Sequence, residues 1–240
     1  PSEINKNVKV DVGIVGDVRV VLNQLLPGVQ RQTHPEWLNR IRDWQEDSDE
    51  RDIINRDGRE KLLSAQVIND LWRYTDGDAI TVTDVGQHQM VACRYAKFNK
   101  TKSNITSGGL GTMGFALPAA IGAKFGDQKR TVLAVIGDGG FQMTIQELGT
   151  VMQFDVDVKI LILNNQFLGM VRQWQELFHE KRYSFTDITS PDFVQVAKAY
   201  RIPGKSVSKR EELKTALHTM LNSKGAYLLE VMVGKENNVF

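Results

Sequence analysis

The sequence contains one cysteine and no long hydrophobic run. Cys93 alone cannot form a disulfide within the chain or build a cysteine-rich zinc site. The longest apolar runs, such as residues 158–163, have the length of a β-strand, far below the roughly 20 residues that cross a bilayer. There is no signal-peptide pattern, and scarce cysteine fits a reducing compartment. We therefore expect a cytoplasmic protein without a membrane partner.

An excess of charge of one sign is also absent. The sequence has 30 basic and 29 acidic residues, the net charge is +1, and no basic block stands out. Such a balance argues against nucleic acid or an anionic membrane surface as a partner. The 41% of hydrophobic and 25% of charged residues are ordinary values for a globular protein.

Three parts of different character follow one another along the chain. Residues 8–15 are rich in β-branched side chains, and a helical pattern follows at 18–26. We interpret residues 1–30 as the tail of a preceding domain. Residues 31–60 are polar and charged, and we predict a helical or irregular connector there. A regular pattern then fills residues 61–240, which we predict to form the main domain.

This pattern predicts an α/β fold, with a parallel sheet covered by helices on both faces. Four β-branched and apolar runs predict strands, at 79–83, 131–136, 158–163 and 226–233. A helical pattern at 61–74 precedes them, and helical patterns separate them at 115–125, 144–154, 169–178, 192–200 and 209–221. Continuous apolar strands alternating with helices are typical of buried parallel sheets. Because such sheets bind ligands at the carboxyl ends of their strands, the loops after these ends are the candidate sites.

Polar, glycine-containing or amide-rich segments follow three of these strands directly. They are TDVGQHQ at 83–89, GDGGF at 137–141 and NNQF at 164–167. Glycine lets backbone amides approach an oxyanion closely, and the N-terminus of a following helix favours negative charge. Phosphate groups are therefore the expected ligands.

Two oxygen-bearing side chains in these segments predict a magnesium site. Asp138 and Asn165 offer hard oxygen atoms, which suit a Mg²⁺ ion that also takes phosphate oxygens. The 24 residues at 140–163 fit one helix and one strand, which brings the two side chains to neighbouring strand ends. A lone Gly-Asp-Gly is usually a tight turn and a lone Asn-Asn a cap. Their combination behind apolar strands favours the metal site.

GDG followed by 24 residues and NN is the thiamin-diphosphate signature. With VGQHQM, TSGGLGTMGFALPAAIGAKFG, GDGGFQMTIQEL and ILILNNQFLGMVRQWQELFHEKRYS, the sequence resembles the catalytic subunits of acetohydroxyacid synthase, also called acetolactate synthase. The resemblance implies a thiamin-diphosphate-binding fold, with the cofactor and Mg²⁺ bound in 61–240. It is most specific over 84–183 and loose over 31–60. Residues 1–30 resemble the end of the family's central domain.

The resemblance also implies ligands for the metal and the diphosphate. Asp138 and Asn165 match the side-chain ligands of Mg²⁺, and Phe167 stands where a backbone carbonyl completes the metal shell. The loops that bind the diphosphate are matched by Val85, Gly86, Gln87, His88, Gly139 and Gly140.

Two further groups match residues beside the reacting part of the cofactor. Gly111 and Met113 match the residues around the aminopyrimidine, where a backbone carbonyl accepts a hydrogen bond and the methionine bends the cofactor. Met170, Val171 and Trp174 match the helix that lines the substrate end. For Met170 and Val171 the alternative is an apolar stripe packed into the core. The stretch 92–100, which includes Cys93, departs from the family pattern and leaves a flavin contact in doubt.

The resemblance implies an enzyme that decarboxylates pyruvate and condenses the product with pyruvate or 2-ketobutyrate, in valine, leucine and isoleucine biosynthesis. It also implies FAD in the full-length enzyme, a homodimer or tetramer, and a regulatory small subunit. In this family the glutamate that activates the cofactor comes from an N-terminal domain of the partner subunit. We therefore expect this chain to be a C-terminal fragment that is inactive alone.

Two other functions remain open. One is another thiamin-diphosphate decarboxylase or carboligase, such as glyoxylate carboligase, although GMVRQWQ and GGLGTMGFALPAAIGA favour the synthase. The other is a non-catalytic domain that binds diphosphate or only assembles with partners.

Overall fold

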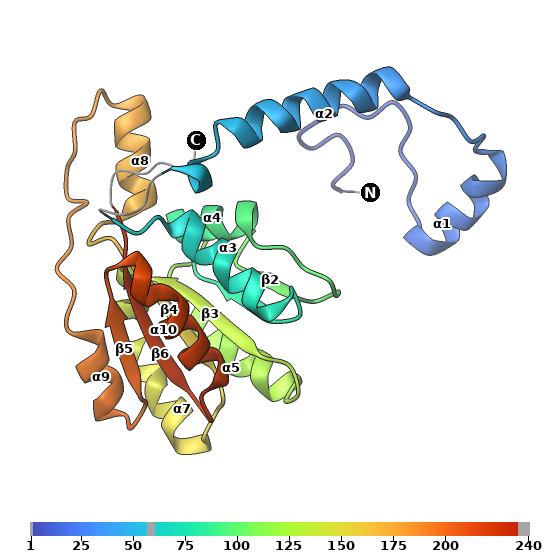
Figure 1. Ribbon diagram of the computed structural model, residues 1–240. Helices are drawn as coiled ribbons and strands as arrows, with labels where there is room; N and C mark the ends of the chain where they lie inside the picture. Colours follow the sequence, from blue (N-terminus) through green and yellow to red (C-terminus); the bar gives the residue numbers. More distant parts are fainter. Residues whose placement is uncertain (1, 57–60, 235–240) are drawn as a thin grey trace. The chain divides into compact units, whose positions relative to one another are not determined.

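The computed structural model describes residues 2–56 and 61–234, and the chain divides into two compact units, Pro1–Arg51 and Asp52–Phe240 (Figure 1). Residues 57–60 of the predicted connector and residues 235–240 of the predicted main domain lie outside the described residues. The predicted boundaries after residues 30 and 60 stay predictions.

The first unit contains helices and, among its described residues, no strand. Helix α1 spans Val18–Leu25, and the Asp17 carboxylate caps it by accepting a hydrogen bond from a first-turn amide. A 3-10 turn, Leu26–Gly28, ends it, and α2 spans Pro35–Glu50. The predicted β structure at 8–15 is wrong, since bends and irregular backbone occupy this stretch. β-Branched residues need a partner strand to form a ladder, and the unit offers none in its described part.

The second unit is built on a six-stranded sheet in which all neighbouring strands run parallel, as predicted. Its order is β2-β1-β3-β4-β6-β5. The strands are β1 Ile80–Thr83, β2 Asn104–Thr106, β3 Val132–Gly137, β4 Lys159–Asn164, β5 Gly204–Val207 and β6 Tyr227–Met232. The four predicted strands are β1, β3, β4 and β6. The sequence pattern missed β2 and β5, which are short, partly exposed edge strands without an apolar run.

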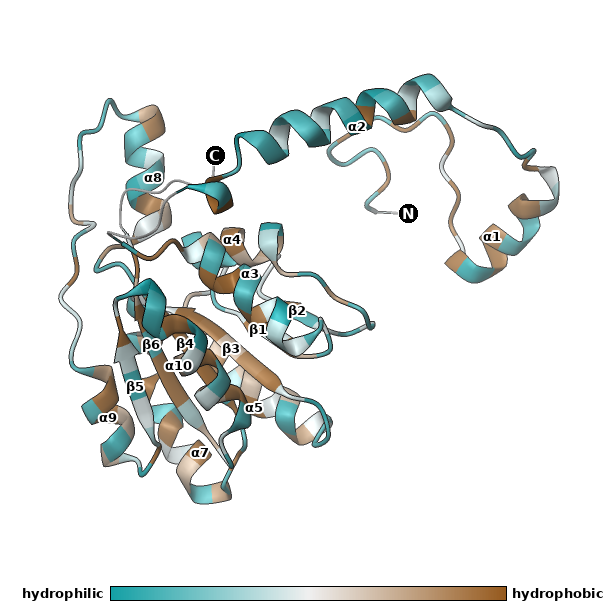
Figure 2. Cartoon of the chain, in the orientation of Figure 1, coloured by the Kyte–Doolittle hydropathy of each residue, from teal (hydrophilic) through white to brown (hydrophobic). Residues whose placement is uncertain are grey.

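Helices cover both faces of this sheet. On one face lie α3 Ser64–Thr75, α4 Gln87–Tyr95 and α10 Arg210–Asn222. On the other lie α5 Ala116–Gly126, α6 Asp138–Met143, α7 Leu148–Phe154 and α9 Phe193–Ala199. Figure 2 shows the central strand β3 in brown, the apolar end of the scale. Helix α8, Gly169–Phe178, contributes to neither core.

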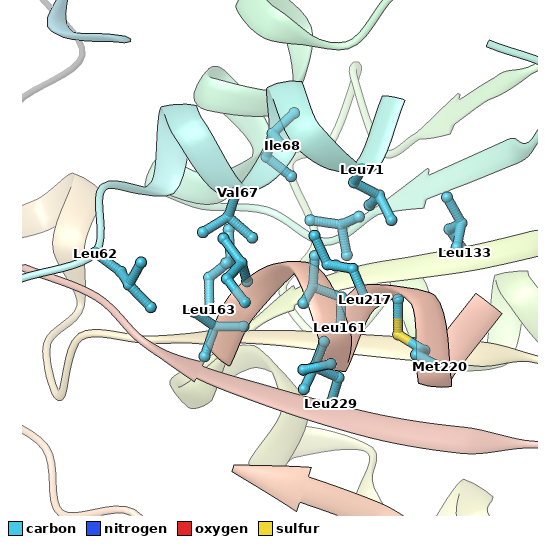
Figure 3. Close-up of a cluster of buried hydrophobic side chains, with 14 of the residues drawn as sticks. Leu62, Val67, Ile68, Leu71, Leu133, Leu161, Leu163, Leu217, Met220 and Leu229 are labelled. Carbon is cyan, nitrogen blue, oxygen red and sulfur yellow. The ribbon is translucent and has the colours of Figure 1, made fainter. Parts of the chain in front are cut away.

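Strand alternation divides the apolar side chains between two cores. In β4, Leu161 and Leu163 point into the first core, with α3 and α10, as Figure 3 shows. Ile160 and Ile162 point into the second core, with α5 and α9. All four side chains are at most 3% exposed, which rigidly fixes the central strand whose end carries the predicted metal loop.

Two short helices appear where the sequence pattern predicts only loops. α4 begins at Gln87, directly after β1, and α6 begins at Asp138, directly after β3. The predicted helix over 144–154 is divided into a 3-10 turn, Ile145–Glu147, and α7. Among the described helices of the chain, none is long and apolar enough to span a membrane.

Candidate functional site

A cavity of about 160 Å³ opens at the carboxyl ends of β1, β3 and β4. Its lining includes every predicted metal and cofactor residue: Val85, Gly86, Gln87, His88, Gly111, Met113, Asp138, Gly139, Gly140, Asn165 and Phe167. Of the predicted substrate residues, Met170 and Val171 line it and Trp174 does not. The sheet thus brings together segments up to 169 positions apart in the chain, from Ser64 to Val233.

The two predicted metal ligands follow neighbouring strands. Gly137 at the end of β3 is in register with Leu163 of β4, so Asp138 and Asn165 leave the sheet side by side. Asp138 is 1% exposed, and Ser190 Oγ donates a hydrogen bond of 3.1 Å to its Oδ2. Burial raises the pKa of the Asp138 carboxyl to about 6. No sequence pattern indicated Ser190, 52 positions away.

The loop after β4 is ordered by amide side chains. Asn165 Oδ1 accepts a hydrogen bond of 3.1 Å from the Phe167 amide, which leaves its second lone pair for a cation. Asn164 is buried, donates to Glu230 Oε1 at 2.7 Å, and accepts from the Gln166 amide at 3.0 Å. Gln166 takes a left-handed φ of 59°. Of the two adjacent asparagines, one therefore supports the loop and the other lines the cavity.

Among the described residues, no three His, Cys, Asp or Glu side chains cluster to hold a metal ion. The donors that the cavity offers are instead the Asp138 carboxylate, the Asn165 amide oxygen and the backbone around Phe167. Such hard oxygen donors suit Mg²⁺, which usually uses one or two carboxylates and completes its shell with phosphate and water oxygens. The residues present therefore fit the predicted metal.

His88 adds a buried polar atom without a partner. Its ring lies against Gly86 and Gly137, where an added Cβ would come within 2.8 Å of ring atoms. Its Nε2 atom is buried and has no hydrogen-bond partner among the residues that the structure describes, and the residue lines the cavity. Burial lowers the pKa of His88 to about 4, so the ring is neutral at pH 7. A bound polar ligand would give Nε2 the partner that it lacks.

Two of the three predicted diphosphate glycines, Gly139 and Gly140, lie in the first turn of α6. Gly140 packs directly on the Asp84 carboxylate, which any added Cβ would overlap. An added Cβ on Gly139 would come within 3.0 Å of the Leu168 side chain. Gly140 therefore excludes a side chain for packing reasons, whereas a side chain at Gly139 would require Leu168 to shift by a few tenths of an ångström.

The predicted aminopyrimidine residues lie on the loop 107–116. Gly111 has a left-handed φ of 65°, and an added Cβ there would lie 3.9 Å from Val85. Met113 is half-buried, and its methyl carbon would lie 3.7 Å from a Cβ added to Gly139. The loop therefore brings both residues against the segments that follow β1 and β3.

Helix α8 is connected to the segment after β1 through a glutamine pair. Gln173 is fully buried, and its Oε1 accepts a hydrogen bond of 3.1 Å from Gln87 Nε2. Met170 and Val171 belong to neither hydrophobic core, so the core-stripe alternative fails for them. Trp174 is 40% exposed and stacks on Phe178 with ring centroids 5.4 Å apart.

Comparison with known proteins agrees with this architecture. The family described as thiamine pyrophosphate enzyme, C-terminal TPP binding domain, matches residues 84–231. The large subunit of acetolactate synthase isozyme 3 from Escherichia coli K12 is 44% identical over 92% of this chain. That of isozyme 2 from the same organism is 41% identical over all of it. The chain spans 39% and 43% of these two relatives.

A solved structure extends the comparison to three dimensions. The thiamine diphosphate-dependent 4-hydroxybenzoylformate decarboxylase of Rhodococcus jostii RHA1 is 28% identical and superposes with a TM-score of 0.68. The match covers 73% of this chain and 33% of the decarboxylase chain. The resemblance to acetolactate synthase predicted from the sequence is thereby confirmed, and the chain belongs to the thiamine pyrophosphate enzymes, whose C-terminal cofactor-binding domain it contains.

Proposed function

We propose that this chain binds the diphosphate of thiamin diphosphate through Mg²⁺ and forms the C-terminal part of an acetolactate synthase. The observation that carries the proposal is the convergence on one cavity of the Asp138 carboxylate, the Asn165 amide and the unpartnered Nε2 of His88. Asp138 is almost completely buried and has no cationic partner in the described part of the chain, which costs free energy that a bound cation would offset.

Each group of cavity residues has a distinct task in this proposal. Asp138, Asn165 and the Phe167 carbonyl bind Mg²⁺, while His88 and the glycine-containing turns contact the diphosphate. Gly111 and Met113 orient the aminopyrimidine. When bound, thiamin diphosphate supplies a nucleophilic thiazolium carbon and an electron sink for decarboxylation of a 2-ketoacid. The chain's own contribution is binding and orientation, which lower the entropic part of the barrier.

In the whole enzyme, we propose condensation of pyruvate with pyruvate or 2-ketobutyrate, on the route to branched-chain amino acids. Met170 and Val171, at the start of α8, line the part of the cavity nearest the acceptor in this proposal, and Trp174 stays a predicted substrate residue. FAD, a homodimeric or tetrameric assembly and a regulatory small subunit belong to the same proposal, which the identity to large subunits supports.

A thiamin-diphosphate decarboxylase that releases free aldehyde is the second candidate. The likeness to a 4-hydroxybenzoylformate decarboxylase favours it, although at 28% identity, against 44% for a synthase subunit. The two functions share cofactor and metal, so only the fate of the decarboxylated unit distinguishes them.

Calorimetry on this chain tests the binding half of the proposal. We expect Mg²⁺-dependent binding of thiamin diphosphate, and loss of that binding in Asp138→Asn. Asp76→Asn is the matched control, because Asp76 is exposed and has a left-handed backbone that Asn also tolerates. Equal binding by wild type and Asp138→Asn would contradict the metal assignment. No binding to wild type would favour a non-catalytic assembly domain.

Product analysis tests the reaction. The full-length protein that contains this sequence is incubated with pyruvate, thiamin diphosphate, Mg²⁺ and FAD. We expect 2-acetolactate as the main product, and 2-aceto-2-hydroxybutyrate when 2-ketobutyrate is added. Release of free acetaldehyde as the main product would favour the decarboxylase, and tartronate semialdehyde from glyoxylate would indicate the other carboligase.

A further inference from the structure

A fully buried carboxylate lies directly behind the cavity, and the predicted ligand set does not include it. Asp84 is 0% exposed and follows β1. Its Oδ2 accepts a hydrogen bond of 3.1 Å from the Gly114 amide, and its Oδ1 accepts one of 3.3 Å from the Ala116 amide. Asp84 is not among the residues that line the cavity. Its contacts are with the protein itself.

These two amides belong to the C-terminal end of the loop 107–116. The loop begins where β2 ends, beside β1, and ends where α5 begins. Ser107 orders its first half, since the Ser107 carbonyl accepts from the Gly111 amide at 3.0 Å and Oγ from the Thr112 amide at 3.1 Å. Asp84 therefore attaches the second half, which follows Met113, to the end of a central strand.

Gly114 is held from a second side as well. Its φ of 83° is left-handed, and Thr144 Oγ1 donates a hydrogen bond of 3.0 Å to its carbonyl. Asp84 also packs directly on Gly140 of α6. One carboxylate thus joins the segment after β1, the loop and α6, which carry the predicted diphosphate and aminopyrimidine residues.

We propose that Asp84 is a positioning residue that holds Gly111 and Met113 in the geometry that the aminopyrimidine requires, without contacting the cofactor. The inference rests on the proposed function and assigns the two halves of the cofactor to different residues. Asp138 and its neighbours bind the metal diphosphate, whereas Asp84 acts on the pyrimidine half through the loop. Comparing the binding of two ligands distinguishes these roles. Inorganic pyrophosphate has the diphosphate of thiamin diphosphate and lacks the aminopyrimidine ring.

Asp84→Asn is the appropriate variant because it keeps the volume of the side chain. Both Asp84 oxygens face N–H donors, and an amide group must turn one NH₂ toward one of these donors. One buried backbone amide then loses its acceptor. Asp127→Asn is the matched control, since Asp127 also accepts two backbone hydrogen bonds, from Lys129 and Arg130, but is only partly buried and lies at the other end of α5.

Calorimetry with Mg²⁺ compares the affinities of each chain for thiamin diphosphate and for inorganic pyrophosphate. For Asp84→Asn we expect the Kd of thiamin diphosphate to rise by about tenfold or more, and that of pyrophosphate to change by less than about threefold. Asp127→Asn should leave both values unchanged, and Asp138→Asn should weaken both. Thr144→Val, which removes the other anchor of Gly114, should reproduce the selective loss if Asp84→Asn fails to fold.

An equal loss of both ligands in Asp84→Asn would overturn the inference, and so would no loss of either. Either result leaves the proposed function intact, provided that wild type binds both ligands. A wild-type chain that binds neither ligand contradicts the proposed function itself.

Discussion

Asp138 combines nearly complete burial with a carboxyl pKa raised to about 6. Because the folded pKa lies above the ordinary 3.8, protonation favours the folded state, and this contribution is lost as the pH rises through about 6. In metal-free buffer at pH 7 we therefore expect Asp138→Asn to stabilise the chain by roughly 2 kcal/mol. Urea unfolding in the presence of EDTA measures this gain. A less stable variant would indicate that the carboxylate serves the fold instead of a cation.

His88 gives a pH dependence of the opposite sign. Burial lowers its pKa from 6.5 to about 4, so the unfolded chain takes up a proton first as the pH falls. The stability that the neutral ring contributes is complete above pH 6.5 and is lost as the pH falls toward 4.

The stability difference between wild type and His88→Gln isolates this contribution, because other titrations cancel in it. Between pH 7 and pH 4 we expect the free energy of unfolding of wild type to fall, relative to that of His88→Gln, by about 3 kcal/mol at most. Urea unfolding at several pH values in metal-free buffer provides the measurement. A difference that stays constant over this range would place His88 in contact with water.

At the scale of elements, two glycines in helices should respond to alanine in opposite ways. Gly140 of α6 is buried against Asp84, whereas a Cβ on Gly122 of α5 would meet no atom within 4 Å. We expect Gly122→Ala to stabilise the chain by about 0.5–1 kcal/mol, since alanine restricts the unfolded chain and favours helix. Gly140→Ala should destabilise it by about 1–3 kcal/mol through overpacking.

Thermal unfolding of the two variants beside wild type tests this pair. The Gly140→Ala protein should also bind thiamin diphosphate more weakly, because the overlap displaces Asp84 or α6. The same change in Tm for both alanine variants would show that the protein accommodates a side chain at Gly140, contrary to this prediction.

The secondary-structure elements also show which parts of the fold could be predicted from sequence patterns. The central strands were predictable because burial on both faces requires continuous apolar runs, as in β4. The edge strand β2 and the helix α6 were not, since one is a short polar strand and the other begins with Asp-Gly-Gly. Of the residues that line the cavity, Asp138 and Asn165 were predictable from their place behind apolar strands, and the other predicted cofactor residues came from a resemblance in motif. Their supports, Asp84 and Ser190, are ordinary residue types whose role depends on contacts across the sheet.

At the scale of the whole molecule, large apolar side chains lie exposed on segments that line or adjoin the cavity. Leu110, beside Gly111, is 93% exposed, and Phe185 is 98% exposed. Along α8, Val171, Leu177 and Phe178 are between 44% and 70% exposed. Exposed apolar groups gathered near a site typically mark an interface. We therefore expect this chain to self-associate, as the proposed assembly requires.

Light scattering over a range of protein concentrations measures this association. Replacing Leu177 and Phe178 with serine should shift the equilibrium toward monomer and leave the unfolding midpoint of the monomer nearly unchanged, because neither side chain belongs to a hydrophobic core. Val12→Ser, at an exposed position of the other unit, is the control. A wild-type chain that stays monomeric at every concentration would contradict self-association through these apolar side chains.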